Sequence, residues 1–388
     1  MEPVYVIGVG MTRFGILEES ISELAEMAAI EAMEDSGTVG QTFDRLLVGS
    51  QNPDEFTGIG HLSTLLADRI GVVPAGATRV ETGPSSGSSA FEAGFSLIAA
   101  GLSNLALVVG VEKMSAVERI TASGILAKMM SKENETRYGA TPIAMAAMMA
   151  RRYMHEFGLT RDELSLVPVK AHRNGARNPL AHFRNEITVE KVSNDRIIAD
   201  PLTLYDSCPI SDGAAALVLA SEKMMRSLAE RDRSVNVLGV GHATDYHAVQ
   251  HRLSLTSMNA TKVAAERAYK MAGLKTEDID VFELHDAFSI LELLNMEDVG
   301  LAKPGTAISM VKDGLTEVDG PSPVNTTGGL KARGHPTGGT GVAQIRDAIL
   351  QIRGESPKGL QVETPSNALC HNIGGFGNNM VVSIFSRI

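Results

Sequence analysis

Short apolar runs without charged residues alternate, through the first third of the chain, with longer segments whose apolar residues recur at a helical period. Buried parallel strands joined by crossover helices produce this alternation, so the pattern predicts an α/β fold. The predicted strands are Val4–Val9, Arg45–Gly49, Thr78–Glu81 and Leu105–Val111, and the predicted helices lie near 20–36, 58–70 and 86–101.

The alternation is interrupted between about residues 113 and 205. One helix is predicted near 142–157, and another opens at Thr160, because Thr160 and Glu163 have the spacing of a capping box. A strand pattern returns at Ala214–Ala220. We expect the region 113–205 to be an insertion that covers a site.

The second half of the chain repeats the first, because VNVLGVGHATD resembles the opening strand VYVIGVGMTRF and a similar order of elements follows each copy. Chance repetition in a Gly-rich chain is the alternative. We predict duplicated βαβαβ halves at 1–225 and 230–388, separated by the polar run 229–234, with a ligand crevice where they meet. The second half is predicted to contain helices near 259–272 and 287–299, a Gly-rich segment 328–341 leading into a helix to about 352, and strands at Asp280–Leu284 and near 366–370 and 379–386.

The charge balance narrows the function. The 388 residues contain 35 Lys and Arg against 46 Asp and Glu, a formal charge of −11, which disfavours nucleic acid as a partner. Two Cys and no Cys/His cluster indicate a reducing compartment and no metal site. The N-terminus has no signal-peptide pattern and the apolar stretch 97–111 is too interrupted to cross a membrane, so we expect a cytoplasmic protein.

Asn325–Gly341 contains six Gly residues, too many for an ordinary helix or strand. Such a loop lets backbone at Gly334 and Gly338 approach a ligand closely. His335 lies inside it before a Pro, where an imidazole can take a proton or donate to an oxyanion. A purely structural role is the alternative for a loop histidine.

His285 and Asp286 follow a predicted buried strand and precede a helix, and such strand ends favour active sites. We interpret Asp286 as a helix cap and leave His285 open as a site residue.

Cys370–Gly377, the third segment, runs from a strand into a Gly-rich turn. His371 and Asn372 lie at the join, and the backbone N–H groups of Gly374 and Gly375 are candidates for an oxyanion site. A tight hairpin would explain the glycines, but not the His-Asn pair.

The fourth segment, Val80–Ala90, ends a strand and opens a helix, so its hydroxyls lie at the positive end of the helix dipole. Ser85 is a candidate nucleophile there, and an ordinary N-cap is the alternative.

Together, these segments in a duplicated α/β chain resemble the thiolase superfamily over nearly the whole length. The stretches that carry the resemblance are GVGMTRFG, ATPIAMAAMMARRYM, AHRNGARNPLAHF, DPLTLYDSCPISDGAAA, HDAF, GGLKARGHPTGGTG and HNIGGFG. The forms HDAF and HNIGGFG resemble the archaeal and sterol-carrier branch of thiolases.

The resemblance implies a five-layer α-β-α-β-α fold and formation or cleavage of a C–C bond beside a CoA thioester. It implies that His335 is the base and oxyanion donor, that His285 orients water in the same oxyanion hole, and that the Gly374 amide serves the other hole. Coenzyme A would be a substrate, with no covalently bound cofactor. The resemblance also implies a homodimer through an apolar edge strand in the 80–115 region, and a small partner protein of zinc-ribbon and OB-fold type.

The sequence departs from the family pattern at two positions. Pro84 stands where the family motif has its nucleophilic Cys, and Pro has neither a nucleophile nor an N–H. Ser85 could replace it only with a small shift and a base such as His335 nearby. Asn372 stands where many thiolases have an acid/base Cys, so His371 or His285 would take that work, and Cys370 remains open. Cys208 is interpreted as a packing residue.

Three functions remain open. The leading hypothesis is an acyl-CoA C-acyltransferase of thiolase type. It leaves open whether a partner subunit is required. The second is an aldolase-type lyase acting on a hydroxyacyl-CoA, which needs a base and an oxyanion hole but no acyl-enzyme. The third is a non-catalytic CoA-binding subunit.

Overall fold

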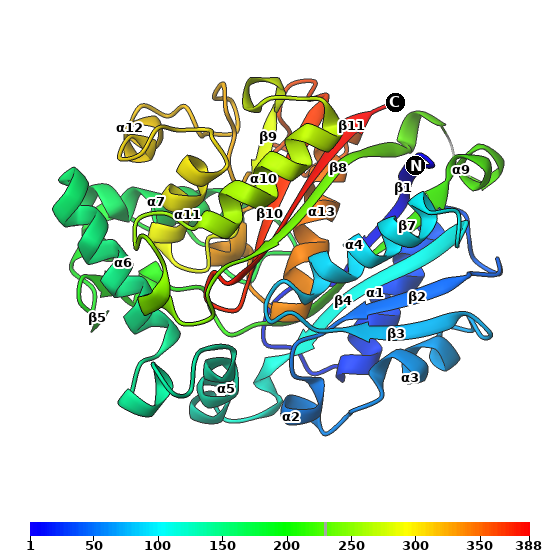
Figure 1. The fold of residues 1–388 in the computed structure, drawn as a ribbon, viewed down its shortest axis with the longest axis horizontal. Helices are drawn as coiled ribbons and strands as arrows, with labels where there is room; N and C mark the ends of the chain where they lie inside the picture. The colour runs from blue at the N-terminus through cyan, green and yellow to red at the C-terminus, as the bar shows by residue number, and fades with distance from the viewer. Residues whose placement is uncertain (229–230) are drawn as a thin grey trace.

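One large sheet organises the computed structural model, which describes residues 1–228 and 231–388 (Figure 1). Within these residues, nine strands are hydrogen-bonded in the order β3-β2-β4-β7-β1-β8-β11-β10-β9. They are β1 Val4–Met11, β2 Arg45–Gly49, β3 Gly76–Val80, β4 Leu105–Lys113, β7 Asp212–Ser221, β8 Val235–Thr244, β9 Val281–Glu283, β10 Asn367–Gly374 and β11 Asn379–Arg387. The short strands β5 Ile197–Ala199 and β6 Leu202–Thr203 pair with each other.

The sheet consists of two similar groups of strands. In each group the strand that begins a copy of the repeat, β1 or β8, pairs antiparallel with the group's last strand, β7 or β11. Only two residue pairs, Tyr5–Asn236 and Val6–Val235, join the groups. The expected domain boundary falls partly on residues 229–230, which lie outside the described residues, so the boundary stays a prediction.

Two helices lie between the two groups of strands. Helix α13 (Thr337–Arg353) contacts β4 and β7 of the first group and β9 and β10 of the second, and it packs against α4 (Ser86–Ala99). On the outer faces, α1 (Ile21–Asp35) covers β1 and β7, and α10 (Asn259–Ala272) covers β8 and β11. These contacts give the expected five-layer order and put the start of α13 at the centre of the molecule.

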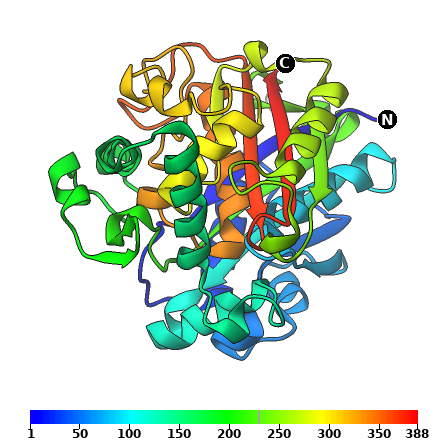
Figure 2. The ribbon, with the colours of Figure 1, turned by 60° about the vertical axis from the view of Figure 1, so that its left-hand side comes forward.

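The region 113–205 forms a largely helical cover, which Figure 2 brings forward. Its capping box is as predicted: the Glu163 N–H donates to Thr160 Oγ1 at 3.2 Å, and the Thr160 N–H donates to Glu163 Oε2 at 2.9 Å. The helices of this region are α5 Arg119–Leu126, α6 Pro142–Phe157, α7 Arg161–Arg177 and α8 Val189–Ser193. Its α7 contacts the second-half helices α11 Ser289–Asp298 and α12 Ala307–Lys312, and α9 Glu222–Leu228 follows β7.

Two expectations need correction. The helix expected near 58–70 is shorter, because Gly58 at φ 76° ends α2 (Pro53–Thr57) and α3 begins only at Leu62 and runs to Arg69. The apolar strand at 105–111 is not an edge strand, because β4 lies between β2 and β7 and is buried along its whole length. The strand at this edge of the sheet is β3, which pairs with β2 alone among the described strands, and β9 forms the opposite edge.

Candidate active site

A cavity of about 460 Å³ lies where the two halves and the helical cover meet. Its polar wall includes His285 from the end of β9 and His335 from the loop before α13. The cover lines the cavity with apolar side chains, so the imidazoles face a largely apolar wall. These side chains are Leu126, Met129, Ile143 and Ile198, and Leu291, Phe288 and Phe376 of the second half add to them.

His335 faces this cavity with an unprotonated nitrogen. Its Nδ1 lies 2.6 Å from Thr340 Oγ1, and the Thr340 hydroxyl donates its only proton to the Pro336 carbonyl at 2.8 Å. The hydroxyl must therefore accept from Nδ1–H, which leaves a lone pair on Nε2. Burial, and then the nearby Arg333 cation, lower the pKa of His335 to about 3, so the imidazole is neutral near pH 7.

The neighbouring imidazole of His285 has the opposite tautomer. The Asn372 side chain donates from Nδ2 to His285 Nδ1 at 2.9 Å, and the Ile373 backbone N–H also points at Nδ1 from 3.3 Å. Because Nδ1 accepts these bonds, the proton of the neutral ring sits on Nε2. Burial, and then His335 and His371, hold the pKa of His285 well below its usual range.

A chain of amide groups anchored to the backbone orients Asn372. Gln344 donates from Nε2 to the carbonyls of Glu283 and His371, at 3.2 and 3.1 Å, which leaves its Oε1 as an acceptor. That oxygen accepts from Asn372 Nδ2 at 2.9 Å, and Ser88 donates to Asn372 Oδ1 at 3.1 Å. If either side-chain amide were flipped, its oxygen would face two hydrogen-bond acceptors instead of its nitrogen. The network therefore holds Asn372 Nδ2 as a donor to His285 Nδ1 and fixes the tautomer of His285.

The two rings meet edge to face, with centroids 5.0 Å apart and planes at 87°. One ring offers a lone pair and the other an N–H to the same cavity. The pair can take a proton from a substrate hydroxyl or carbon and, at the same time, stabilise an oxyanion.

The segment at residue 84 supplies no nucleophile to the cavity. Pro84 itself forms part of the wall. Ser85 is fully buried and not among the lining residues; its hydroxyl donates to the Thr82 carbonyl at 2.9 Å and lies 2.9 Å from Thr82 Oγ1. The structure therefore does not bring Ser85 to His335, as covalent catalysis would require.

His371 does not reach the cavity either. Side chains alternate along β10, so His371 points to the face opposite that of Asn372 and lies 3.1 Å from Thr261 Oγ1 of α10. Cys370 shares the face of Asn372, but its thiol contacts the Gln344 carbonyl at 3.4 Å and lies outside the cavity. Burial raises the pKa of Cys370 well above its usual range.

The glycines have unequal roles. Gly375 lines the cavity, whereas Gly374 packs against Ser85 and Thr82, where a Cβ would lie 2.3 Å from each. The Gly338 N–H donates to the carboxylate of Glu112 at 3.1 Å, so it is not free for CoA. Gly334, at φ 113°, packs against Ser211 and Phe14 rather than lining the cavity.

Sequence reasoning described two residues incompletely. Cys208 packs against the hydrophobic core, as expected, but it also lines the cavity. Burial raises the pKa of its thiol to about 12, so little thiolate exists near pH 7. Asp286 does not cap α11; its Oδ1 accepts from the Leu330 N–H at 2.6 Å, across from the segment Gly329–Arg333, which forms a π-helix, η8. π-Helices are common at functional sites, but the Gly-rich sequence of this segment did not predict one.

The described residues contain no group of three or more His, Cys, Asp or Glu side chains that could hold a metal ion. No helix among them is long and apolar enough to span a membrane.

Comparisons with known proteins agree with this fold. Residues 4–223 match the thiolase N-terminal domain, and residues 241–387 match the thiolase C-terminal domain-like family. The chain therefore belongs to the thiolase family, as its motifs predicted.

Individual relatives cover the whole chain. It is 42% identical, over 388 residues and 100% of both chains, to an acetyl-CoA acetyltransferase of Methanothermobacter thermautotrophicus. It is 32% identical to the sterol carrier protein 2 of Bos taurus over 98% of this chain and 72% of that one. Among solved structures, the "Ltp2-ChsH2(DUF35) aldolase" superposes with a TM-score of 0.85 at 25% identity, covering 99% of this chain and 98% of that one.

Proposed function

We propose that this chain cleaves or forms the C–C bond beside a CoA thioester by aldolase-type chemistry, without an acyl-enzyme. The observation that carries the proposal is the cavity itself, in which a basic nitrogen and an N–H donor converge while Pro84 occupies the expected nucleophile position. The structural similarity to a protein named an aldolase supports it.

The reaction follows from the tautomers. His335 Nε2 takes the proton of the β-hydroxyl of a 3-hydroxyacyl-CoA, a carbonyl forms at Cβ, and the Cα–Cβ bond breaks. The electron pair of that bond forms the thioester enolate, whose oxygen accepts a hydrogen bond from the N–H of His285. The His335 imidazolium then returns its proton to Cα. The products are an aldehyde or ketone and a shortened acyl-CoA, and no free CoA is consumed.

A second candidate is thiolysis, favoured by the acetyltransferase name of the archaeal relative. In that reaction His335 would deprotonate free CoA, whose thiolate would attack a 3-ketoacyl-CoA directly. Free CoA would then be consumed, and two acyl-CoA molecules would form. The third reading, a non-catalytic CoA-binding subunit, predicts neither reaction.

Product analysis distinguishes these functions. The protein, alone and with any co-purifying subunit, is incubated with 3-hydroxyacyl-CoA and separately with 3-ketoacyl-CoA plus CoA. We expect trapped aldehyde or ketone and a shortened acyl-CoA in the first reaction, absent with His335→Ala. Products from the second reaction alone would overturn the aldolase proposal in favour of thiolysis, and none from either would support the non-catalytic role.

We also propose that the protein forms a homodimer, and the free edge of β3 supports this. An edge strand presents unpaired backbone groups that a second copy can cover. Light scattering that gives the mass of one chain would contradict the dimer.

A small zinc-ribbon/OB-fold partner, which completes the CoA site, is a further proposal; the name of the structural neighbour, which joins two proteins, supports it. Co-purification of a zinc-containing subunit would support this partner, and full activity of the isolated chain would contradict it. Two free thiols, at Cys208 and Cys370, support a cytoplasmic location, which cell fractionation tests.

A further inference from the structure

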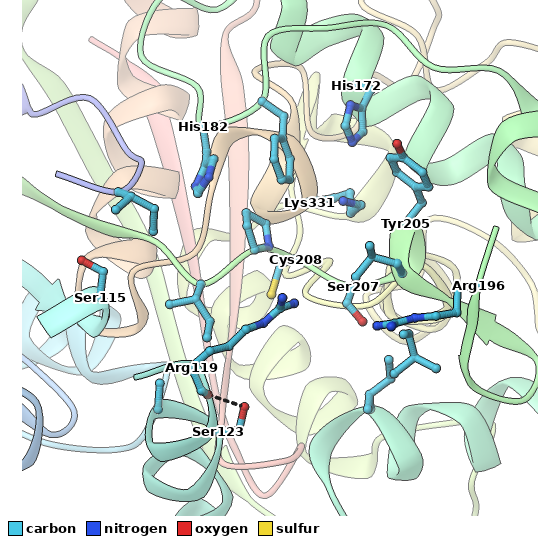
Figure 3. A pocket seen from close by; sticks show the side chains of 18 of the residues that line it. Ser115, Arg119, Ser123, His172, His182, Arg196, Tyr205, Ser207, Cys208 and Lys331 are labelled. Atoms are coloured by element: carbon cyan, nitrogen blue, oxygen red, sulfur yellow. Dashed lines mark hydrogen bonds between the residues drawn. The ribbon is translucent and has the colours of Figure 1, made fainter. Parts of the chain in front are cut away.

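A second cavity, of about 850 Å³, lies directly beside the catalytic cavity (Figure 3). The two share the wall formed by Cys208, Pro209 and Ile210, and the Cys208 side chain lines both. The reaction described above uses none of the polar groups in this second cavity.

Lys331, from the π-helix that leads to His335, is the buried cation of this cavity. The residue is only 2% exposed, and its ammonium group lies over the rings of Phe183 and Tyr205, at 5.0 and 5.8 Å from their centroids. These ring contacts are the only close interactions of its ammonium group in the part of the chain that the structure describes. Burial lowers the pKa of Lys331 to about 8. An ammonium group buried in this way lacks the anion that ordinarily compensates it.

The rest of the cavity has the same sign of charge. Arg119 and Arg196 extend into it from opposite sides in Figure 3. No Asp or Glu is among its described lining residues, although the chain as a whole carries a charge of −11. The two carboxylates that act on Lys331 from outside are engaged elsewhere: Asp206 accepts from Arg161 at 2.7 Å, and Asp286 accepts from the Leu330 N–H.

His172 adds a second unpartnered group. Its Nδ1 donates to the Asn185 carbonyl at 3.0 Å, so Nε2 carries a lone pair, and this buried Nε2 has no partner among the described residues. Together with Lys331 it leaves a donor and an acceptor open on one side of the cavity. The Lys331 cation suits an anion, whereas the His172 lone pair would accept from an N–H or O–H of the ligand or of water.

We propose that this cavity binds a carboxylate at the far end of the acyl group, so that the substrates are CoA thioesters of carboxylated acyl chains. This inference rests on the proposed function and adds the class of substrate to it. Lys331 lies next to Cys208, one side chain away from the imidazoles, so an acyl substituent that passes Cys208 reaches it. The phosphates of CoA, which a whole pantetheine arm separates from the thioester, are the alternative anion, and the comparison with free CoA distinguishes them.

Binding of unreactive thioethers tests the proposal. Calorimetry would compare S-(ω-carboxyalkyl)-CoA, S-alkyl-CoA of matched chain length and free CoA. For the wild-type protein we expect the carboxylated probe to bind about 10- to 100-fold more tightly than the alkyl probe, as one charge-assisted hydrogen bond gives. Equal affinity for the two thioethers would overturn the proposal.

Variants identify the cation responsible. Lys331→Met keeps the aliphatic stem and should remove most of this preference, and Arg196→Gln, at an exposed position, should reduce it without a risk to folding. Lys191→Met is the matched control, because Lys191 also lies over the Tyr205 ring, at 5.4 Å, but does not line the cavity. The preference should persist there.

The remaining outcomes are also decisive. If Lys331→Met and Arg196→Gln weaken all three ligands equally, including free CoA, the cations serve the CoA phosphates and the carboxylate proposal fails. If no CoA derivative binds the wild-type protein, alone or with a co-purified subunit, the proposed function itself fails. Binding of CoA derivatives without a preference for the carboxylate would overturn this inference alone.

Discussion

Asn372 Nδ2 lies 2.9 Å from His285 Nδ1, and together with the Ile373 N–H at 3.3 Å it makes this nitrogen an acceptor. His285 therefore presents an N–H to the cavity, while His335, held by Thr340, presents a lone pair. An acid–base pair at neutral pH thus follows from two neutral histidines with no charge in the cavity wall between them.

Replacement of His335 tests the base. His335→Gln removes the basic nitrogen and should lower kcat about 10²- to 10⁴-fold, because proton transfer typically contributes that much. His371→Gln is the matched control, since His371 faces α10 and should leave kcat within a few-fold of wild type. Equal losses in both variants would contradict the assignment.

The donor role of His285 is testable through Asn372. In Asn372→Asp a carboxylate replaces the amide donor, so His285 should shift its proton to Nδ1 and lose the N–H that faces the cavity. We expect kcat to fall about 10²- to 10³-fold, as for loss of one oxyanion donor, and ¹⁵N NMR to report the changed tautomer.

A surface pair provides the control for that substitution. Asn378 Nδ2 lies 2.9 Å from His247 Nδ1 at an exposed site. Asn378 packs behind Gly375 of the cavity wall but does not itself line the cavity, so Asn378→Asp makes the same chemical change without touching His285. Its kcat should match wild type. A wild-type tautomer in Asn372→Asp would contradict the network described for Gln344 and Asn372.

The sequence predicted the fold and the two imidazoles, but not which neighbouring side chains face the cavity with them. Periodicity located nearly every strand, and GHP and HDAF marked His335 and His285. What the sequence did not give is orientation: Ser85 and His371 are one or two residues from cavity-lining positions but face away from the cavity, whereas Asn372 acts on it only through His285. Only the register of β10 and the turn at Thr82 decide which of them face it. Lys331 was missed because the Gly-rich segment was interpreted as a loop, which gives no direction for a side chain, whereas Gly329–Arg333 forms a π-helix.

Restoring a nucleophile tests why the chain has Pro84. In a Cys208→Ser background, Pro84→Cys puts a thiol on the cavity wall near His335 and should yield an acyl adduct with acyl-CoA, detected as a mass increase of one acyl group. Ser85→Cys in the same background is the control, because position 85 points at Thr82 and should remain unmodified. An adduct on the wild-type protein would contradict catalysis without an acyl-enzyme.

Buried neutral histidines also make the fold sensitive to acid. Burial lowers the pKa of His371 to about 3, against a usual value of about 6.5, so the unfolded chain takes up a proton near pH 6 that the folded chain does not. Stability is therefore greatest above pH 6.5 and falls as the pH drops toward 3. Between pH 7 and 5 this one residue should cost about 2 kcal/mol.

Urea unfolding at pH 7 and pH 5 measures this cost. His371→Gln, which cannot titrate, should reduce the loss of unfolding free energy between the two pH values by about 2 kcal/mol, whatever its effect at pH 7. His155→Gln, at an exposed position of α6, is the control and should keep the wild-type loss. If His371→Gln loses as much stability as wild type on acidification, His371 is protonated in the folded state, and its packing against Thr261 does not hold it neutral.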